Sequence, residues 1–290
     1  MKKLFTLILT TTLWSSTVNA QDLKMYACGI TRVSFVKELN KAFSKKFKIK
    51  TSLNKKGGVS FVLKGLSQKK IIVGAGCRET FKSKNEKNLW STQVAWGALG
   101  FIVNPKNKID NLSTEDIKKI LTGKITNWKE VGGENKQIHL ILRAGKSSGV
   151  GSTARKILFN DKNQTFSQQA TRVKSSGPIR KAVEKDIYAF AIDDVTSSRR
   201  IKNVKLLQVD GVKPTKENIL SNNYKVRRAF FLYLGQKPTD LAKKYIDFAL
   251  SEEGQKVISK TGTANLEEAT GKGDEENLIF QNLQFDVKTK

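Results

Sequence analysis

Along this 290-residue chain an apolar stretch, a turn rich in glycine or serine, and an amphipathic segment follow one another in the same order three times. In the first unit, Phe35, Leu39 and Phe43 recur at helical spacing after the strand-like residues 24–28. The other two strand-like stretches that lead into such turns are residues 48–54 and 137–145. Strands that alternate with helices favour a parallel sheet covered by helices, so the pattern predicts an α/β fold.

Further elements fit the same pattern. Ser113 is suited to cap a helix over residues 114–122, and Gly123 is suited to end it. Residues 227–234 read as a late strand, and residues 241–262 read as one last long amphipathic helix.

The first 20 residues have the composition of a secretory signal peptide. Lys2 and Lys3 precede an apolar run of about a dozen residues, which is shorter than the roughly 18–20 that cross a bilayer. Val18 and Ala20 supply a small-x-small cleavage pattern. We therefore expect cleavage after Ala20 and a periplasmic location. Removing 20 residues from 290 leaves 270, enough for two lobes that each bury a core.

The net charge of +27 makes anions the expected partners. Basic residues are spread along the chain as pairs, without the interleaved aromatic residues of single-strand binding surfaces, so no nucleic-acid partner is expected. A cationic envelope protein that holds acidic polymers on its surface is the alternative that this charge leaves open.

The residues suited to metal binding or catalysis are few. Cys28 and Cys77 are the two cysteines and His139 is the one histidine, so we expect no metal, no cofactor and no enzymatic activity. His139 lies in a strand and is interpreted as a core or edge residue. Asp193 and Asp194 are expected to cap a turn or helix, or to pair with Arg199 or Arg200.

Turns of small residues directly before helices are the candidate anion sites. The free backbone amides and the positive dipole end of a helix N-terminus hold oxyanions. Residues 28–31, 55–58 and 147–149 are three such turns, and they can converge on one ligand if two lobes close over it.

Four segments carry a resemblance to a known family. They read NLSTEDIKKILTGKITNWKEVGG, ILRAGKSSGVGSTARKILF, VKPTKENILSNNYKVRRAFFLYL and FALSEEGQKVISKTG, and they occur in the order found in phosphate-binding proteins of ABC transporters. The resemblance spans residues 24–266. It implies two α/β lobes joined by two crossover strands, with residues 22–101 and 227–290 in lobe 1 and residues 102–226 in lobe 2. It further implies a solute-binding protein that captures a small inorganic oxyanion, phosphate or a similar one, between its lobes for ABC transport or for sensing. We expect an ABC permease as its partner and a monomeric chain.

Carried over by position, the resemblance implies four anion loops. The first anion loop contains Gly29, Ile30 and Thr31, and the second contains Lys55 and Lys56 ahead of Gly57 and Gly58. The third contains Gly76, Cys77 and Arg78, and the fourth contains Arg143, Ser147, Ser148 and Gly149. Arg143 is expected to be the main charge partner of the ligand, through a bidentate fork.

Several positions depart from the family pattern. Cys77 stands where relatives often have an aspartate or a serine-type hydroxyl, Lys55 or Lys56 replaces a serine donor, and Val150 lacks an expected hydroxyl. Arg32 follows Thr31 where an apolar residue is common. The site is thus more cationic and poorer in hydroxyls, which favours a fully deprotonated or multiply charged anion.

Cys28 and Cys77 both map to anion loops of lobe 1. The leading interpretation is a disulfide, which closes a loop of about 50 residues and stabilises the fold by roughly 3–4 kcal/mol in the chain-entropy model. One alternative is a soft-ligand site in which the thiolates, with Met25, hold Cu(I) or a thiol-reactive solute. Another is an enzyme that uses a reactive Cys77 thiolate beside Arg78.

Overall fold

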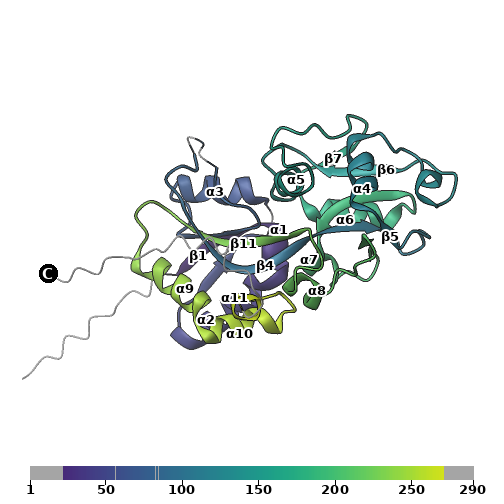
Figure 1. Ribbon diagram of the computed structural model, residues 1–290. Coiled ribbons are helices and arrows are strands. Elements are labelled where there is room, and N and C mark those ends of the chain that lie inside the picture. The colour runs from purple at the N-terminus through teal and green to yellow at the C-terminus, as the bar shows by residue number, and fades with distance from the viewer. Residues whose placement is uncertain (1–21, 56, 82, 84, 271–290) are drawn as a thin grey trace, which may run out of the picture.

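The computed structural model describes residues 22–55, 57–81, 83 and 85–270, and shows two α/β lobes side by side (Figure 1). The expected signal peptide, Lys56 and the tail after residue 270 lie outside the described residues. Within the described part, no helix has both the length and the apolar character needed to cross a membrane.

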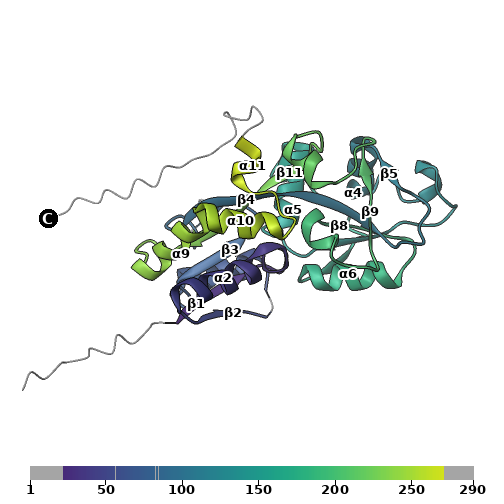
Figure 2. The same cartoon turned by 90° about the horizontal axis from the view of Figure 1, so that it is seen from below.

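Lobe 1 contains a mixed sheet of parallel and antiparallel strands. β1 (Leu23–Ala27) pairs in parallel with β2 (Thr51–Leu53) and β3 (Val73–Gly76), and β11 (Arg227–Leu234) runs antiparallel to β3. The helices of this lobe are α1 (Gly29–Thr31), the π-helical η1 (Arg32–Val36), α2 (Lys37–Phe47), α3 (Val59–Ser67), α9 (Asp240–Leu250), α10 (Glu252–Lys260) and α11 (Leu266–Thr270). Figure 2 shows α2 and α10 beside each other.

Lobe 2 has a smaller sheet. β6 (His139–Arg143) lies between its parallel neighbours β7 (Thr171–Val173) and β8 (Ala189–Asp194). The other strands are β5 (Asn111–Leu112), β9 (Lys205–Leu206) and β10 (Gln208–Val209). The helices are α4 (Thr114–Thr122), η2 (Trp128–Val131), α5 (Gly149–Ala154), η3 (Arg155–Phe159), α6 (Ser176–Lys185), α7 (Val195–Ser198) and α8 (Lys216–Leu220).

One long strand, β4 (Trp90–Val103), links the two sheets. Its first part pairs with β11 as far as Ala98, and from Leu99 onward it pairs with β8, so a single path of strands runs through both lobes. The chain returns beside it, where the backbone amide of Leu99 donates to the carbonyl of Val226 at 2.9 Å. The expected α/β fold with two crossing segments is confirmed.

The core of lobe 1 explains why its helices form where they do. The ring of Phe43 on α2 contacts the rings of Tyr245 and Phe248 on α9, with centroid distances of 5.0 and 5.6 Å. Burying such rings is the main force that holds an amphipathic helix on its sheet. Because α2 is fixed in this way, the helical run over residues 29–47 presents its N-terminus toward lobe 2 (Figure 1).

The last long helix was predicted wrongly as continuous. The helical pattern over residues 241–262 is divided at Ser251. Its extended backbone (φ −66°, ψ 157°) ends α9, and its hydroxyl accepts from the amide of Gly254 at the start of α10. A Cβ atom at Gly254 would lie 1.9 Å from the carbonyl oxygen of Phe248, so only glycine permits this tight turn.

Candidate functional site

The four anion loops meet between the lobes. The amide of Gly29 in the first loop donates to the carbonyl of Gly57 beside the second, at 3.2 Å. A Cβ atom at Gly149 in the fourth loop would lie only 2.5 Å from the sulfur of Cys77 in the third. The convergence that the sequence could only suggest is therefore present in the structure.

Direct hydrogen bonds hold the fourth loop on lobe 1. The hydroxyls of Ser60 and Ser147 are 3.1 Å apart, and Nε of Arg78 donates to the carbonyl of Ser147 at 3.1 Å. The hydroxyl of Thr153 donates to the carbonyl of Cys77 at 3.5 Å. These contacts describe two lobes closed on each other.

Helix N-termini face this contact from both lobes. Cys28 is the N-cap of the helical run over residues 29–47, Gly58 is the N-cap of α3, and Ser148 is the N-cap of α5, where its hydroxyl accepts from the amide of Gly151 at 3.1 Å. Amides and positive dipole ends that converge in this way attract anions.

Arg143 lies at the end of β6, half-buried among these helix ends. Its Nη2 donates to the carbonyl of Lys174 at 2.8 Å, and its Nη1 donates to the hydroxyl of Ser176 at 3.4 Å. A Cβ atom at Gly58 would be 2.9 Å from Nη2, so the glycine lets the guanidinium approach the N-terminus of α3. Burial lowers the pKa of Arg143, while the nearby thiols and Asp193 oppose that shift.

A second arginine approaches from lobe 1. Arg32, in η1, donates to the carbonyl of Asn54 at 3.3 Å, and its Nη2 is 3.8 Å from the Cβ position of Gly29. Burial lowers its pKa as well. Within the described residues neither Arg32 nor Arg143 has an ion pair with a carboxylate. Two cations without a carboxylate partner, one from each lobe, thus border the contact between the lobes where the anion loops meet, which we call the cleft.

The two aspartates at the end of β8 are neutralised by other arginines. Asp193 pairs with Arg180 from α6, and Asp194 pairs with Arg228 from β11 at 2.9 Å. Asp194 also accepts from the amide of Ser197 at 3.0 Å and so caps α7. The expected helix cap is confirmed, but the pairing with Arg199 or Arg200 was wrong.

These ion pairs are buried and incompletely satisfied. Burial raises the pKa of Asp194, against the effect of Arg228. For Arg228, burial alone lowers the pKa, but the Cys77 thiol and Asp194 outweigh it and raise the pKa. Nε and Nη1 of Arg228, Nε of Arg143 and Oδ1 of Asp193 have no hydrogen-bond partner among the described residues. Unpaired buried polar atoms are costly, and they cluster at this contact between the lobes.

The two cysteines are neighbours in the cleft. Their sulfurs are 3.8 Å apart, both are free thiols, and both side chains are buried. A disulfide requires about 2.05 Å, so the expected bond is not formed in this structure and stays a prediction. Burial by itself raises the pKa of Cys28, but hydrogen bonds from Cys77, Thr31 and the backbone outweigh it and lower the pKa to about 6. The shared hydrogen bond, followed by burial, raises the pKa of Cys77 well above its usual value.

The expected ligand residues differ in how deeply they are buried and in how many of their donors are already in use. Ile30 and Ser148 are buried, Thr31 is fully buried, and Lys55 is exposed. The guanidinium of Arg78 forms a two-pronged ion pair with Glu86 at 2.8 and 2.9 Å, so most of its donors are already engaged within lobe 1.

The sequence did not single out Ser176, Arg180 or Arg228 as part of the site. Ser176 follows the same rule as the anion loops, since it is a small polar residue that opens a helix, and the Ser-Ser-Gly before Pro178 would have revealed it. Arg180 and Arg228 reach the cleft only through the tertiary fold, so no local pattern identifies them.

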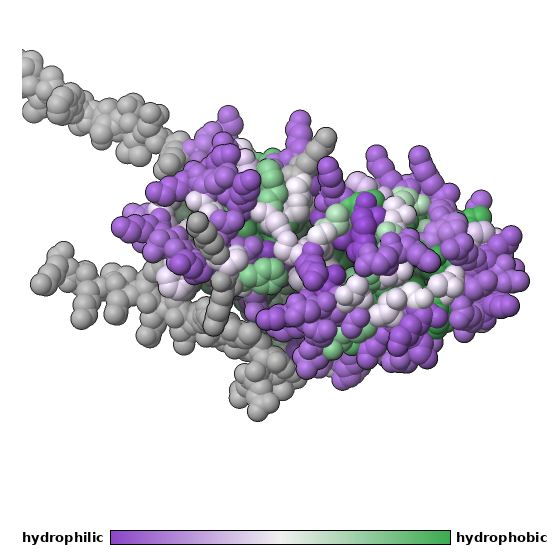
Figure 3. Space-filling view, turned by 90° about the horizontal axis from the view of Figure 1, so that it is seen from above, coloured by the Kyte–Doolittle hydropathy of each residue, from purple (hydrophilic) through white to green (hydrophobic). Residues whose placement is uncertain are grey.

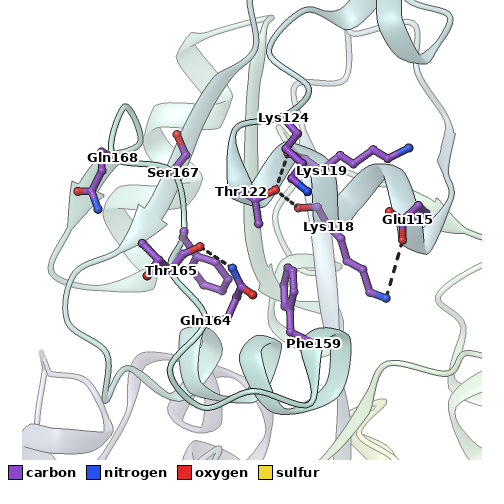
Figure 4. A pocket seen from close by; sticks show the side chains of 11 residues that line it. Glu115, Lys118, Lys119, Thr122, Lys124, Phe159, Gln164, Thr165, Ser167 and Gln168 are labelled. Atoms are coloured by element: carbon purple, nitrogen blue, oxygen red, sulfur yellow. Dashed lines mark hydrogen bonds and ion pairs between the residues drawn. The ribbon is translucent and has the colours of Figure 1, made fainter.

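Other features lie away from the cleft. His139 is exposed at the first position of β6, an inner strand of the sheet, and its Nδ1 is 2.6 Å from Asp186. A pocket of about 520 Å³ between α4 and residues 159–168 is lined by three lysines, one of which, the half-buried Lys118, is 3.9 Å from Glu115 (Figure 4). A smaller cavity of about 10 Å³, roughly one water molecule, lies inside lobe 2 between Arg143, Arg155 and Phe166. No group of three or more metal-ligating side chains occurs in the described part of the chain.

Comparison with known proteins adds independent findings. Residues 36–253 match the family model described as the PBP superfamily domain. The chain is 32% identical to the phosphate-binding protein PstS of Borreliella burgdorferi over 213 residues, which cover 71% of this chain and 76% of the relative. A putative phosphate ABC transporter substrate-binding protein with bound phosphate, from Clostridium perfringens, matches with a TM-score of 0.76 and 26% identity over 85% of this chain and all of that one. An ABC-type phosphate transport receptor from Vibrio cholerae shares the fold, with a TM-score of 0.64 and 23% identity over 84% of this chain and 99% of that one.

Proposed function

The chain belongs to the PBP superfamily as a phosphate-binding-like solute-binding protein, and we propose that it captures phosphate or a closely similar oxyanion between its lobes. The observation that carries this proposal is the pair of uncompensated guanidiniums, Arg32 and Arg143, set among converging helix N-termini. Amides and guanidiniums that are already oriented can replace the hydration shell of an anion at little cost in reorganisation.

The lobes must open for a ligand to enter. In this structure the hydroxyls of Ser60 and Ser147 are 3.1 Å apart and Nε of Arg78 donates to the carbonyl of Ser147, so the two lobes contact each other directly beside the proposed site. The crossing segments at Leu99 and Val226 are the places where a hinge can act, since β4 changes its pairing partner there. Opening and closure about these segments would admit the anion and then enclose it.

The charges in the cleft favour a doubly charged ligand. Asp193 and Asp194 are each neutralised by an arginine, so Arg32 and Arg143 leave two positive charges for the anion when the thiols are neutral. Arg143 with Ser147, Ser148 and Gly149 would hold it from lobe 2, and Gly29, Ile30 and Thr31 would hold it from lobe 1. Lys55, Lys56, Cys77 and Arg78 border this position in our assignment.

The cellular location, the oligomeric state and the partner of the chain are part of the same proposal. The chain is exported, cleaved after Ala20 and periplasmic, and acts as a monomer without cofactor, metal or catalytic step. Lobe 1 comprises residues 22–101 and 227–290, and lobe 2 comprises residues 102–226. An ABC permease receives the anion.

Calorimetric titration of the mature chain with phosphate, sulfate, arsenate and molybdate tests the proposal. We expect one anion per chain and saturable heats for phosphate. Flat titrations with all four anions would refute it.

A second candidate, a protein that holds polyanions on its surface, is favoured by the net charge and by the hydrophilic side chains that cover most of the face in Figure 3. Binding to a long polyanion should weaken steeply with salt and should not depend on Arg143. Titration with a sulfated polysaccharide at two salt concentrations, compared with phosphate under the same conditions, separates the two.

A further inference from the structure

The sulfur of Cys28 occupies the N-terminal end of the first anion loop. Cys28 is the N-cap of the helical run over residues 29–47, and its sulfur is 3.3 Å from the hydroxyl of Thr31. Thr31 is one of the donors that the proposed function assigns to the oxyanion. A thiolate at a helix N-terminus is stabilised by the same dipole and amides that attract a bound anion.

The second sulfur extends this position toward lobe 2. Cys77 lies 3.8 Å from Cys28, and the backbone of Gly149 at the start of α5 lies directly against it. The pair therefore stands between helix ends that belong to different lobes. The charged and titratable groups that interact electrostatically with the two cysteines are Arg32, Arg143, Arg228, Asp194 and Tyr233. The arginines outnumber the carboxylates, which favours a negative charge on the sulfur.

We propose, on the basis of the oxyanion-binding function above, that Cys28 sets the affinity of the cleft for its anion. As a thiolate it engages the donors of the first anion loop and repels the ligand. As a neutral thiol, or as one half of a disulfide with Cys77, it leaves those donors and the charges of Arg32 and Arg143 to the ligand. The Cys28 thiolate thus competes with the ligand for the same donors, and protonation or oxidation of its sulfur ends this competition.

Oxidation needs an acceptor, and a low-molecular-weight disulfide such as oxidised glutathione supplies one. The Cys28 thiolate attacks one sulfur of glutathione disulfide and releases one glutathione thiolate. Cys77 then loses its proton and attacks the mixed disulfide, which releases the second glutathione. Two electrons pass to glutathione, and the protein loses the negative charge from its cleft.

The test measures phosphate affinity of the mature chain by calorimetry in its reduced form, in its form oxidised with glutathione disulfide, and as Cys28→Ala. Thiol labelling verifies the redox state. With the pKa of Cys28 at about 6, about 3% of the thiol is protonated at pH 7.5, so the reduced chain should bind about 30-fold more weakly than the other two. At pH 5 the three forms should agree within about twofold, because Cys28 is then mostly protonated.

The ratio of dissociation constants between reduced wild type and Cys28→Ala at each pH cancels the titration of phosphate itself. Cys77→Ala is the matched control: it removes the hydrogen bond that lowers the pKa of Cys28, so the pH dependence should move to higher pH. Equal affinities in all forms, or tighter binding by the reduced chain, would overturn this inference alone. Absence of binding in every form would refute the proposed function and this inference together.

Discussion

Replacing Arg143 with alanine should weaken anion binding strongly. A guanidinium has five N–H donors, and two of them are used by Lys174 and Ser176, so a bidentate fork toward the cleft is still available. Charge-assisted hydrogen bonds contribute about 1.5–3 kcal/mol each, and the partly exposed position of Arg143 keeps the pair of bonds near about 2–4 kcal/mol. This corresponds to a loss of about 30- to 1,000-fold in affinity.

The assay is calorimetric titration of the oxidised chain with phosphate. In this form neither cysteine sulfur is charged, so the variants differ only at position 143. Arg143→Lys retains the charge and loses the fork, so its affinity should fall between that of wild type and alanine. Lys146→Ala is the matched control, since this exposed residue of the neighbouring turn carries the same charge. It should change affinity by no more than about twofold, as expected for a screened surface charge.

The stability of each variant separates binding from folding, because Arg143 also ties β6 to the segment before α6. Thermal unfolding without ligand should show similar midpoints for the alanine and lysine variants. If Arg143→Ala binds phosphate as well as Lys146→Ala does, Arg143 is not the charge partner and the assignment of the cleft is wrong.

Three further changes test the surroundings of the site. Arg228→Met leaves Asp194 buried and unpaired, so urea denaturation should show a loss of about 3–5 kcal/mol, and a loss below about 1 kcal/mol would contradict the buried ion pair. Gly149→Ala forces a Cβ atom against the sulfur of Cys77 and should weaken phosphate binding about tenfold or more, on the scale of 1.4 kcal/mol per tenfold. Gly177→Ala, which meets nothing within 4 Å, is its control, and equal affinities of the two would count against the closed arrangement. Ser251→Ala removes the cap of α10 and should cost about 1 kcal/mol in thermal or urea unfolding, whereas an unchanged midpoint would contradict the division of that helix.

Local patterns predicted the elements whose boundaries depend on local chemistry. The strand over residues 227–234 was predicted with its observed ends, and α4 begins after its Ser113 cap and ends before Gly123, which has the positive φ of 79° that favours glycine. The break at Ser251 escaped prediction because the apolar periodicity continues across it. What divides the helix is the approach of Phe248 to Gly254, a contact that periodicity does not encode.

In the candidate site, too, the residues that depend on local sequence could be predicted and those that depend on tertiary contacts could not. The first, second and fourth loops could be found because each is a short turn before a helix, whereas the third, at Gly76, Cys77 and Arg78, follows a strand and came from the resemblance alone. The partners of the aspartates could not be found, because Arg180 and Arg228 come from different elements and lie 13 and 34 residues away in the sequence. Arg199 and Arg200, the near neighbours in sequence, instead donate to backbone carbonyls of Pro214 and Val33. Proximity in the chain is a poor guide where β-strands bring distant segments together.

The surface charge and the cleft charge should act on different steps of binding. Exposed lysines attract anions over a distance that salt limits to about 8 Å at physiological ionic strength, so they act on the rate of encounter. Arg32 and Arg143 are partly buried between helix ends, where salt screens their interaction with an enclosed anion much less. Added salt should therefore slow association more than it speeds dissociation. A surface that held polyanions by its lysines alone would lose equilibrium affinity steeply instead. Measuring the effect of salt on the association rate and on the dissociation rate therefore distinguishes capture in the cleft from adsorption on the surface.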